Sequence, residues 1–134
     1  MVFAVIDTNI LVSALISHNS NASTVRVVES MFMGLLVPMF NDDILAEYEE
    51  VLHRKKFRLT EEQIHLVVDW VKEQGVDASR IAYNGDFPDE DDRVFYEVSL
   101  SREDSFLVTG NLKHFPKTPR VVTAAEMIEI LGLS

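Results

Sequence analysis

The sequence predicts an α/β fold in which a mainly parallel sheet is covered by helices on both faces. Short apolar runs rich in β-branched residues alternate along the chain with longer segments whose apolar residues recur at helical spacing. Strands that are separated by helices need crossover connections, and such connections place neighbouring strands parallel. The length of 134 residues suits a single domain over residues 1–134, because one domain usually contains about 100–200 residues.

The first half of the chain alternates between predicted strands and predicted helices. The expected elements are a strand over 2–6, helices over 10–16 and 22–33, a strand over 35–39, and helices that start at Asn41 or Asp42 and at Thr60. The helix after Asn41 has one apolar face, because Ile44, Tyr48 and Val51 recur three or four residues apart. The next helix begins with a capping box of the form Thr-x-x-Gln.

The second half continues the alternation with shorter strands. The expected elements are a short strand over 81–83, an acidic loop over 86–92 that leads into a helix, strands over 105–109 and 121–122, and a last helix that starts at Thr123. The pattern Thr123-x-x-Glu126 is a second capping box.

The composition excludes several functional classes. The chain has no cysteine, which excludes disulfide frameworks, zinc–thiolate sites, iron–sulfur clusters and thiol nucleophiles, and which suits a reducing cytoplasm, the location we expect. Met1 to Ile6 lacks a basic start and Asp7 interrupts the apolar run, so we expect no signal peptide. We also expect no membrane contact, because no apolar stretch approaches the roughly 18 residues that a spanning helix requires.

The net charge of −10 is unfavourable for binding nucleic acid. Such a chain attracts phosphate backbones poorly, so we do not expect tight non-specific binding to nucleic acid. Carboxylates that converge on one point repel each other, and a divalent cation relieves that repulsion.

Four polar side chains are predicted to meet at one edge of the sheet. Asp7 ends the first strand, Asp92 opens the helix after the acidic loop, and Asn111 follows the strand that ends at Thr109. Glu47 lies one turn into a helix that itself follows a strand, at about 100° from the centre of the apolar stripe. Sites in parallel sheets lie beyond the carboxyl ends of the strands. Oxygen ligands of this kind suit Mg²⁺ or Mn²⁺.

Each of these residues also has a structural interpretation. Asp7 could only cap the following helix, Glu47 could lie on a solvated helix face, and the acidic stretch over 86–92 could be a solvated loop. Asn111 after Gly110 is ordinary in a turn. All four together at the predicted site edge favour a shared function.

The order and spacing of four motifs resemble the PIN domain family over almost the whole chain. Residues 5–14 (VIDTNILVSA) resemble its first strand and Asp-Thr-Asn motif, and Glu47 within 44–48 (ILAEY) matches the acid of its second motif. Residues 89–97 (DEDDRVFYE) resemble the third motif, in which Asp92 takes the metal-binding place and Asp91 is the alternative. Residues 106–111 (FLVTGN), followed by His114 and Phe115, resemble the fourth motif.

The resemblance implies a three-layer α/β/α sandwich and a metal-dependent ribonuclease. Within the family, the chain resembles a branch of toxin components of toxin–antitoxin systems that are related to VapC-like ribonucleases. Asp7, Glu47 and Asp92 would hold one or two Mg²⁺ or Mn²⁺ ions, and Asn111 would complete the catalytic set. Metal lowers the pKa of a bound water, so that no protein nucleophile is needed. The implied partners are an RNA substrate, a small antitoxin protein and a second copy of the chain in a homodimer.

The sequence departs from the family at Asn111, where many relatives carry Asp. A carboxamide oxygen can ligate a metal or orient a water, but it brings no charge, and this weakens the expectation of a two-metal site. His18, His53, His65 and His114 do not have the spacing of a metal set, and His114 has a packing or surface role or contacts substrate.

Basic residues gather in one short segment at the end of a predicted helix. The segment contains Arg54, Lys55, Lys56 and Arg58. It can contact an RNA backbone, or it can be a solvated helix end whose cations face the negative end of the helix dipole.

Two functional classes remain open. The first is a ribonuclease, acting as a toxin that an antitoxin neutralises. The second is a catalytically weak PIN-fold protein that binds RNA or a protein partner, and the feature that favours it is Asn111.

Overall fold

A five-stranded sheet with only parallel pairs runs through the centre of the molecule in the computed structural model, which describes all 134 residues. The strand order is β3-β2-β1-β4-β5. The strands are β1 (Val2–Ile6), β2 (Leu36–Phe40), β3 (Val76–Asp77), β4 (Ser105–Val108) and β5 (Val121–Val122). The predicted α/β class with a parallel sheet is therefore confirmed.

The chain also forms six α-helices and three short 3₁₀ helices. The α-helices are α1 (Thr8–Ile16), α2 (Ser23–Phe32), α3 (Asp42–Leu52), α4 (Glu61–Gln74), α5 (Arg93–Ser99) and α6 (Ala124–Ile130). The 3₁₀ helices are η1 (Lys55–Phe57), η2 (Glu90–Asp92) and η3 (Leu112–His114). Both predicted capping boxes are present, at Thr60 with Gln63 and at Thr123 with Glu126.

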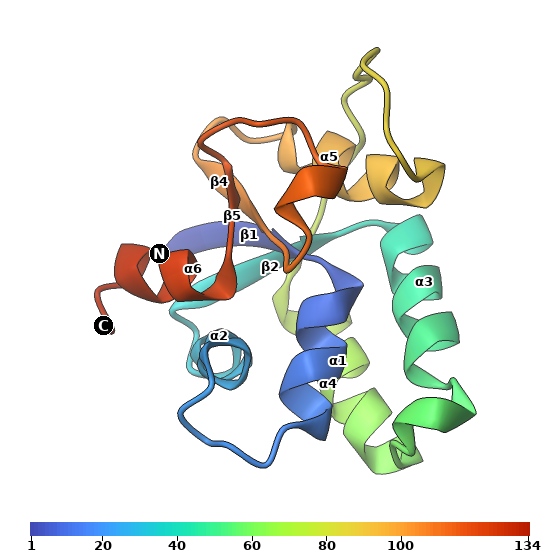
Figure 1. Cartoon of the computed structure of the whole chain (residues 1–134), viewed down its shortest axis with the longest axis vertical. Coiled ribbons are helices and arrows are strands. Elements are labelled where there is room, and N and C mark those ends of the chain that lie inside the picture. Colours follow the sequence, from blue (N-terminus) through green and yellow to red (C-terminus); the bar gives the residue numbers. More distant parts are fainter.

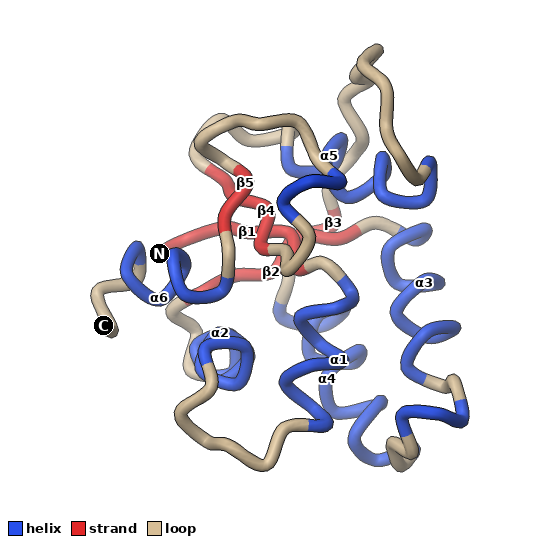
Figure 2. The backbone as a smooth tube through the Cα atoms, in the orientation of Figure 1, coloured by secondary structure: helices blue, strands red, loops and turns tan.

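The helices form layers on the two faces of the sheet. Helix α5 lies on one face, and α1, α2 and α4 lie on the opposite face (Figures 1 and 2). Helix α3 starts where β2 ends and packs against α1, α4 and α5. Side chains from the two faces of the sheet and from these helices form one continuous apolar core. The arrangement is the three-layer α/β/α sandwich that the resemblance implies.

Three details differ from the sequence-based predictions. The strand predicted over 81–83 is wrong: this segment is irregular, and its Ile81 N–H donates to the Glu97 carbonyl instead of to a strand. The third strand is Val76–Asp77, which pairs with the end of β2 and was not predicted. Helix α1 starts at Thr8 instead of Ile10, so that Asp7 takes the N-cap position.

No helix in the protein combines the length and the apolar character that crossing a membrane requires.

Candidate functional site

Asp7 lies at the carboxyl end of the central strand and is almost fully buried, with 5% of its surface exposed. Strand β1 pairs with β4 so that Ile6 lies opposite Val108. The next residues of the two strands, Asp7 and Thr109, are therefore neighbours as well. The Asp7 N–H donates to the Val108 carbonyl at 2.9 Å.

The carboxylate of Asp7 is held by two side-chain donors. Its Oδ2 accepts hydrogen bonds from Thr109 Oγ1 at 2.7 Å and from Asn9 Nδ2 at 3.2 Å. The Oδ1 of Asn9 in turn accepts from the Gly110 N–H at 3.2 Å. The Asp-Thr-Asn and Thr-Gly-Asn motifs are thus joined by hydrogen bonds, and these fix the orientation of Asp7.

Glu47 approaches the same place from α3. The buried side chain of the next residue, Tyr48, donates its hydroxyl hydrogen bond to the Ile6 carbonyl, which fixes α3 against the end of β1. Glu47 is half-buried, as its predicted place beside the apolar stripe requires, and its Oε2 accepts from the Thr8 hydroxyl. Thr8 follows Asp7 directly in the chain, so the hydrogen bond from Thr8 holds the Glu47 carboxylate close to Asp7.

Asp92 ends η2 at the start of α5, and His114 ends η3. The Nδ1 of His114 lies 3.2 Å from Asp92 Oδ2, and the exposed fractions of the two side chains are 45% and 17%. The orange turn that follows β4 accordingly lies beside α5 (Figure 1). This contact brings the third motif and the end of the fourth motif together.

The three carboxyl groups share one unfavourable electrostatic environment. Burial raises the pKa of Asp7 from 3.8 to about 6, and the Asp92 charge adds to this against the opposing hydrogen bond from Thr109. Burial is also the main cause that raises the pKa of Glu47, followed among the raising causes by the charges of Asp7 and Asp92. The pKa of Asp92 is raised by burial and by Asp89, against the effect of His114. The three groups therefore repel one another.

No lysine or arginine forms an ion pair with Asp7, Glu47 or Asp92. The one basic side chain beside these carboxylates is His114, which contacts Asp92. A buried carboxylate without a cation is costly. Their oxygen donors and their unbalanced charge match what Mg²⁺ or Mn²⁺ requires. As the side chains lie, however, no group of three or more histidine or acidic side chains is arranged to hold a metal ion. The residues thus fit a divalent cation by chemistry and charge, but they do not form a closed ligand shell.

Asn111 follows the site in the chain but presents its side chain to solvent. Its N–H donates to Thr109 Oγ1 at 3.0 Å, and its side chain is exposed. Asp91, the alternative to Asp92, is also exposed and lines a hollow of about 430 Å³ together with Glu47 and Glu50. The role of Asn111 in the site and the assignment of Asp92 over Asp91 stay predictions.

The basic segment lies at the far end of α3 from the strand edge. Lys55 and Lys56 are exposed in η1, and Arg54 forms an ion pair with Glu50 at 2.9 Å. Arg58 has a left-handed backbone, with φ of 53°. The contact of this basic segment with RNA stays a prediction.

Sequence reasoning assigned no role to the residues that orient the carboxylates. These are Thr8, Asn9 and Thr109, whose side chains donate to Glu47 or Asp7. A signal was present, since each is a polar residue within or beside the motifs that carry the acids.

A family model described as "PIN domain" matches residues 4–113 of the chain. The matched segment includes Asp7, Glu47, Asp92 and Asn111. No curated protein and no solved structure matches the chain.

Proposed function

The chain belongs to the PIN domain family, and from this premise we propose that it is a metal-dependent ribonuclease that cleaves RNA phosphodiester bonds. The PIN domain is a nuclease fold, and often that of a ribonuclease. The finer assignment rests on this chain's own residues. Acids from three distant parts of the sequence lie at the carboxyl edge of a parallel sheet, and this arrangement carries the proposal. Asp7 is buried at the end of β1, and Glu47 accepts a hydrogen bond from the adjacent Thr8. Asp92 is partly buried beside His114, and its charge contributes to the raised pKa values of Asp7 and Glu47.

Asp7, Glu47 and Asp92 would hold the metal ion. When bound, Mg²⁺ or Mn²⁺ supplies a water of lowered pKa and neutralises negative charge on the phosphate. The protein itself positions the carboxylates. Thr109 and Asn9 hold the Asp7 carboxylate by hydrogen bonds, Thr8 does the same for Glu47, and His114 contacts Asp92. Asn111 would lie at the entrance, where its exposed carboxamide can hydrogen-bond a water or a phosphate oxygen.

The test is a cleavage assay on total RNA with Mn²⁺, with Mg²⁺ and with EDTA. We expect cleavage with a metal ion, none with EDTA, and a loss of at least 100-fold in the Asp7→Asn variant. Asp91→Asn is the matched comparison, because it removes the exposed carboxylate of the residue next to Asp92 and so tests the assignment of Asp92 over Asp91. Cleavage that persists in EDTA, or that survives in Asp7→Asn, would show that these carboxylates do not carry the activity.

The second candidate function is an RNA- or protein-binding module of low catalytic power. The uncharged, exposed side chain of Asn111 and the open arrangement of the carboxylates favour it. The same assay separates the two functions, because a binding module retains RNA on a filter without shortening it in any of the three buffers.

The biological setting that we propose is a toxin–antitoxin pair, in which a small antitoxin neutralises the ribonuclease. Expression of the chain alone should then arrest growth, and co-expression of a small neighbouring reading frame should relieve the arrest. Growth arrest in Asp7→Asn as strong as in the unaltered chain would speak against a ribonuclease toxin.

We also propose that the active unit is a homodimer. Helix α4 buries Ile64, Val67, Val68 and Val71 within the chain. Its Leu66 is 60% exposed, and its partly exposed Trp70 forms a T-shaped pair with Phe32. Apolar side chains of this size on one surface are suited to a contact between two chains. Light scattering that gives the 15.2 kDa mass of one chain at all micromolar concentrations would exclude the dimer.

A further inference from the structure

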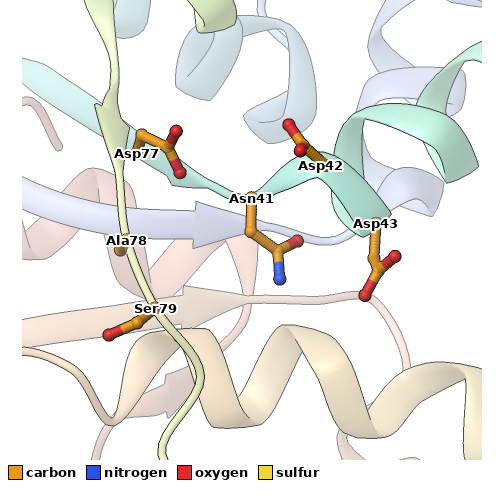
Figure 3. A pocket seen from close by; sticks show the side chains of 6 residues that line it. All are labelled: Asn41, Asp42, Asp43, Asp77, Ala78 and Ser79. Atoms are coloured by element: carbon orange, nitrogen blue, oxygen red, sulfur yellow. The ribbon is translucent and has the colours of Figure 1, made fainter.

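The hollows on the surface of the protein differ in charge. A hollow of about 470 Å³ at the start of α3 contains three aspartates, among them Asp77 at the end of β3 (Figure 3). The hollow of about 430 Å³ between α3 and η2 is lined by five acidic residues and by Arg80. Without a bound metal ion, both would repel a strand of phosphates, because their linings are acidic and the whole molecule carries a net charge of −10.

The loop after β4 lines two hollows that contain no carboxylate. Their volumes are about 380 Å³ and about 340 Å³, and both are lined by Leu112 and Lys113. The two hollows adjoin at these residues, and we call them together the 110–118 groove. Its lysines are Lys113 and Lys117, and His114 also lines it. Both lysines are exposed and take part in none of the protein's ion pairs, so their charges are available to a ligand.

The groove begins at the candidate site. His114 lines it and contacts Asp92 at 3.2 Å. Asn111 lines it as well, and its N–H donates to the Thr109 hydroxyl that holds Asp7. A strand in the groove would thus have its next phosphate close to the carboxylates.

The apolar part of the groove suits unpaired bases. Leu112 is 43% exposed, and the buried Phe115 forms part of the wall. The ring centroids of Phe115 and Phe87 lie 6.1 Å apart, with the two rings nearly perpendicular. Unpaired bases present apolar faces that such surfaces can contact, whereas bases in a duplex are covered by their neighbours.

We propose that the 110–118 groove binds a single-stranded RNA segment beside the cleaved phosphate, with backbone phosphates at Lys113 and Lys117 and a base against Leu112. The proposal rests on the proposed ribonuclease function. It places the substrate away from the basic segment over 54–58, which begins about 10 Å beyond Glu47 along the helix axis at 1.5 Å per residue. In that segment Arg54 is already paired with Glu50.

Two matched double variants separate the two surfaces. Lys113→Gln with Lys117→Gln and Lys55→Gln with Lys56→Gln each remove two exposed lysine charges. The probe is a short fluorescent single-stranded RNA that contains 4-thiouridine, and its affinity is measured by anisotropy in EDTA at several salt concentrations. We expect the first variant to bind at least 10-fold more weakly and its salt slope to fall by about 1.4, because each phosphate contact on a single strand contributes about 0.7. We expect the affinity of the second variant for the RNA to fall by less than 3-fold.

Photocrosslinking with the same probe gives the position directly. Crosslinks within residues 110–118 are expected, and crosslinks confined to 54–58 would overturn the proposal. Equal losses in the two double variants would overturn it too. Displacement of the RNA by polyglutamate as readily as by unlabelled RNA would identify the groove as a surface for acidic peptides instead.

The cleavage assay with Mn²⁺ distinguishes failure of this proposal from failure of the proposed function. If the unaltered protein cleaves RNA while the Lys113/Lys117 variant binds and cleaves as well as it does, the groove is not the binding surface and the ribonuclease stands. If the unaltered protein neither binds nor cleaves RNA, both proposals fail.

Discussion

At the scale of single residues, the environment of Asp7 is costly for an ionised carboxylate. The side chain is buried beside Glu47 and Asp92 and receives hydrogen bonds from neutral donors only. Burial and the Asp92 charge raise its pKa to about 6, against the Thr109 hydrogen bond, so the group is mostly ionised at pH 7. Such strain is common at functional sites, where a ligand relieves it.

Replacing Asp7 with Asn should stabilise the metal-free protein at pH 7.5. The carboxamide keeps an acceptor for Thr109 and Asn9 but carries no charge. A pKa raised from 3.8 to about 6 corresponds to a gain of up to about 3 kcal/mol in the free energy of unfolding. Urea denaturation in EDTA measures it, with Asp91→Asn as the control that should change by less than about 0.5 kcal/mol. An Asp7→Asn variant less stable than the unaltered protein would contradict this reading of the site.

The same shift gives a pH dependence with a definite sign. Because the folded-state pKa of Asp7 lies above the unfolded value, the folded protein binds more protons between about pH 4 and pH 6. The contribution of Asp7 to stability is complete below the unfolded pKa and is lost as the pH rises through about 6. The stability of the unaltered protein minus that of Asp7→Asn should therefore fall from pH 4.5 to pH 7.5 in EDTA. A difference that does not change with pH would show that the carboxyl has an ordinary pKa.

Thr109 should be needed for its hydroxyl group. It is fully buried, donates to Asp7 and accepts from the Asn111 N–H. Thr109→Val keeps the shape but leaves these groups unpaired, and should lower the free energy of unfolding by about 1–3 kcal/mol. Thr109→Ser keeps the hydroxyl and loses one methyl group, worth about 0.8 kcal/mol. If the valine variant proves as stable as the serine variant in urea at pH 7.5, the hydroxyl has no orienting role.

At the scale of elements, the sequence predicted the long segments and missed the short ones. Helices such as Glu61–Gln74 have an apolar stripe and a capping box, both of which are local signals. Strand β3 has only two residues, one of them charged, and its pairing with β2 depends on the tertiary fold. The apolar segment over 81–83 has the composition of a strand, but its backbone binds Glu97 instead.

In the candidate site, too, the sequence predicted some features and missed others. The strand-end rule and the helical spacing predicted that Asp7 and Glu47 lie at one edge of the sheet, and in the structure Glu47 accepts a hydrogen bond from Thr8, the residue after Asp7. The partners Thr8 and Thr109 could not be assigned, because the acceptor of a hydroxyl depends on which strands are neighbours and on its rotamer. That information is tertiary and has no local pattern.

The segment between β3 and η2 is held to α5 by one buried carboxylate. Glu97 is 6% exposed and accepts hydrogen bonds from Arg80 Nε at 2.8 Å and from the Tyr83 N–H at 2.9 Å. Its Oε1 also forms an ion pair with Arg80 Nη2 at 2.7 Å. Burial raises its pKa, but Tyr83 and Arg80 outweigh burial and the pKa is lowered overall. Its contribution to stability is therefore present at neutral pH and is lost as the pH falls through its lowered pKa.

Glu97→Gln should release this segment. The expected loss is about 1–3 kcal/mol in the free energy of unfolding, because hydrogen bonds to a charged group are weakened. Amide hydrogen exchange should become faster over residues 78–89. The control is Arg54→Gln, which breaks an exposed ion pair with Glu50 and should cost less than about 1 kcal/mol. Unchanged exchange over 78–89 would show that the aromatic contacts of Tyr83 and Phe87 hold the segment without Glu97.

At the scale of the whole molecule, the proposed metal site predicts that a divalent cation stabilises this acidic protein. Binding to the folded state alone adds about 2.7 kcal/mol at a metal concentration of roughly 100 times Kd. The melting temperature should rise with millimolar Mn²⁺, and the rise should be absent in Asp7→Asn. A rise of equal size in both proteins would indicate general screening of the net charge of −10.

The most direct test of the carboxylate centre is to count bound Mn²⁺ by the loss of its free electron paramagnetic resonance signal. The unaltered protein should bind at least one Mn²⁺ per chain, and Asp7→Asn, Glu47→Gln and Asp92→Asn should each weaken that binding by 10-fold or more. Asp91→Asn should bind as the unaltered protein does. Equal Mn²⁺ binding by the unaltered protein and the three variants would contradict the assignment of these carboxylates as a metal centre.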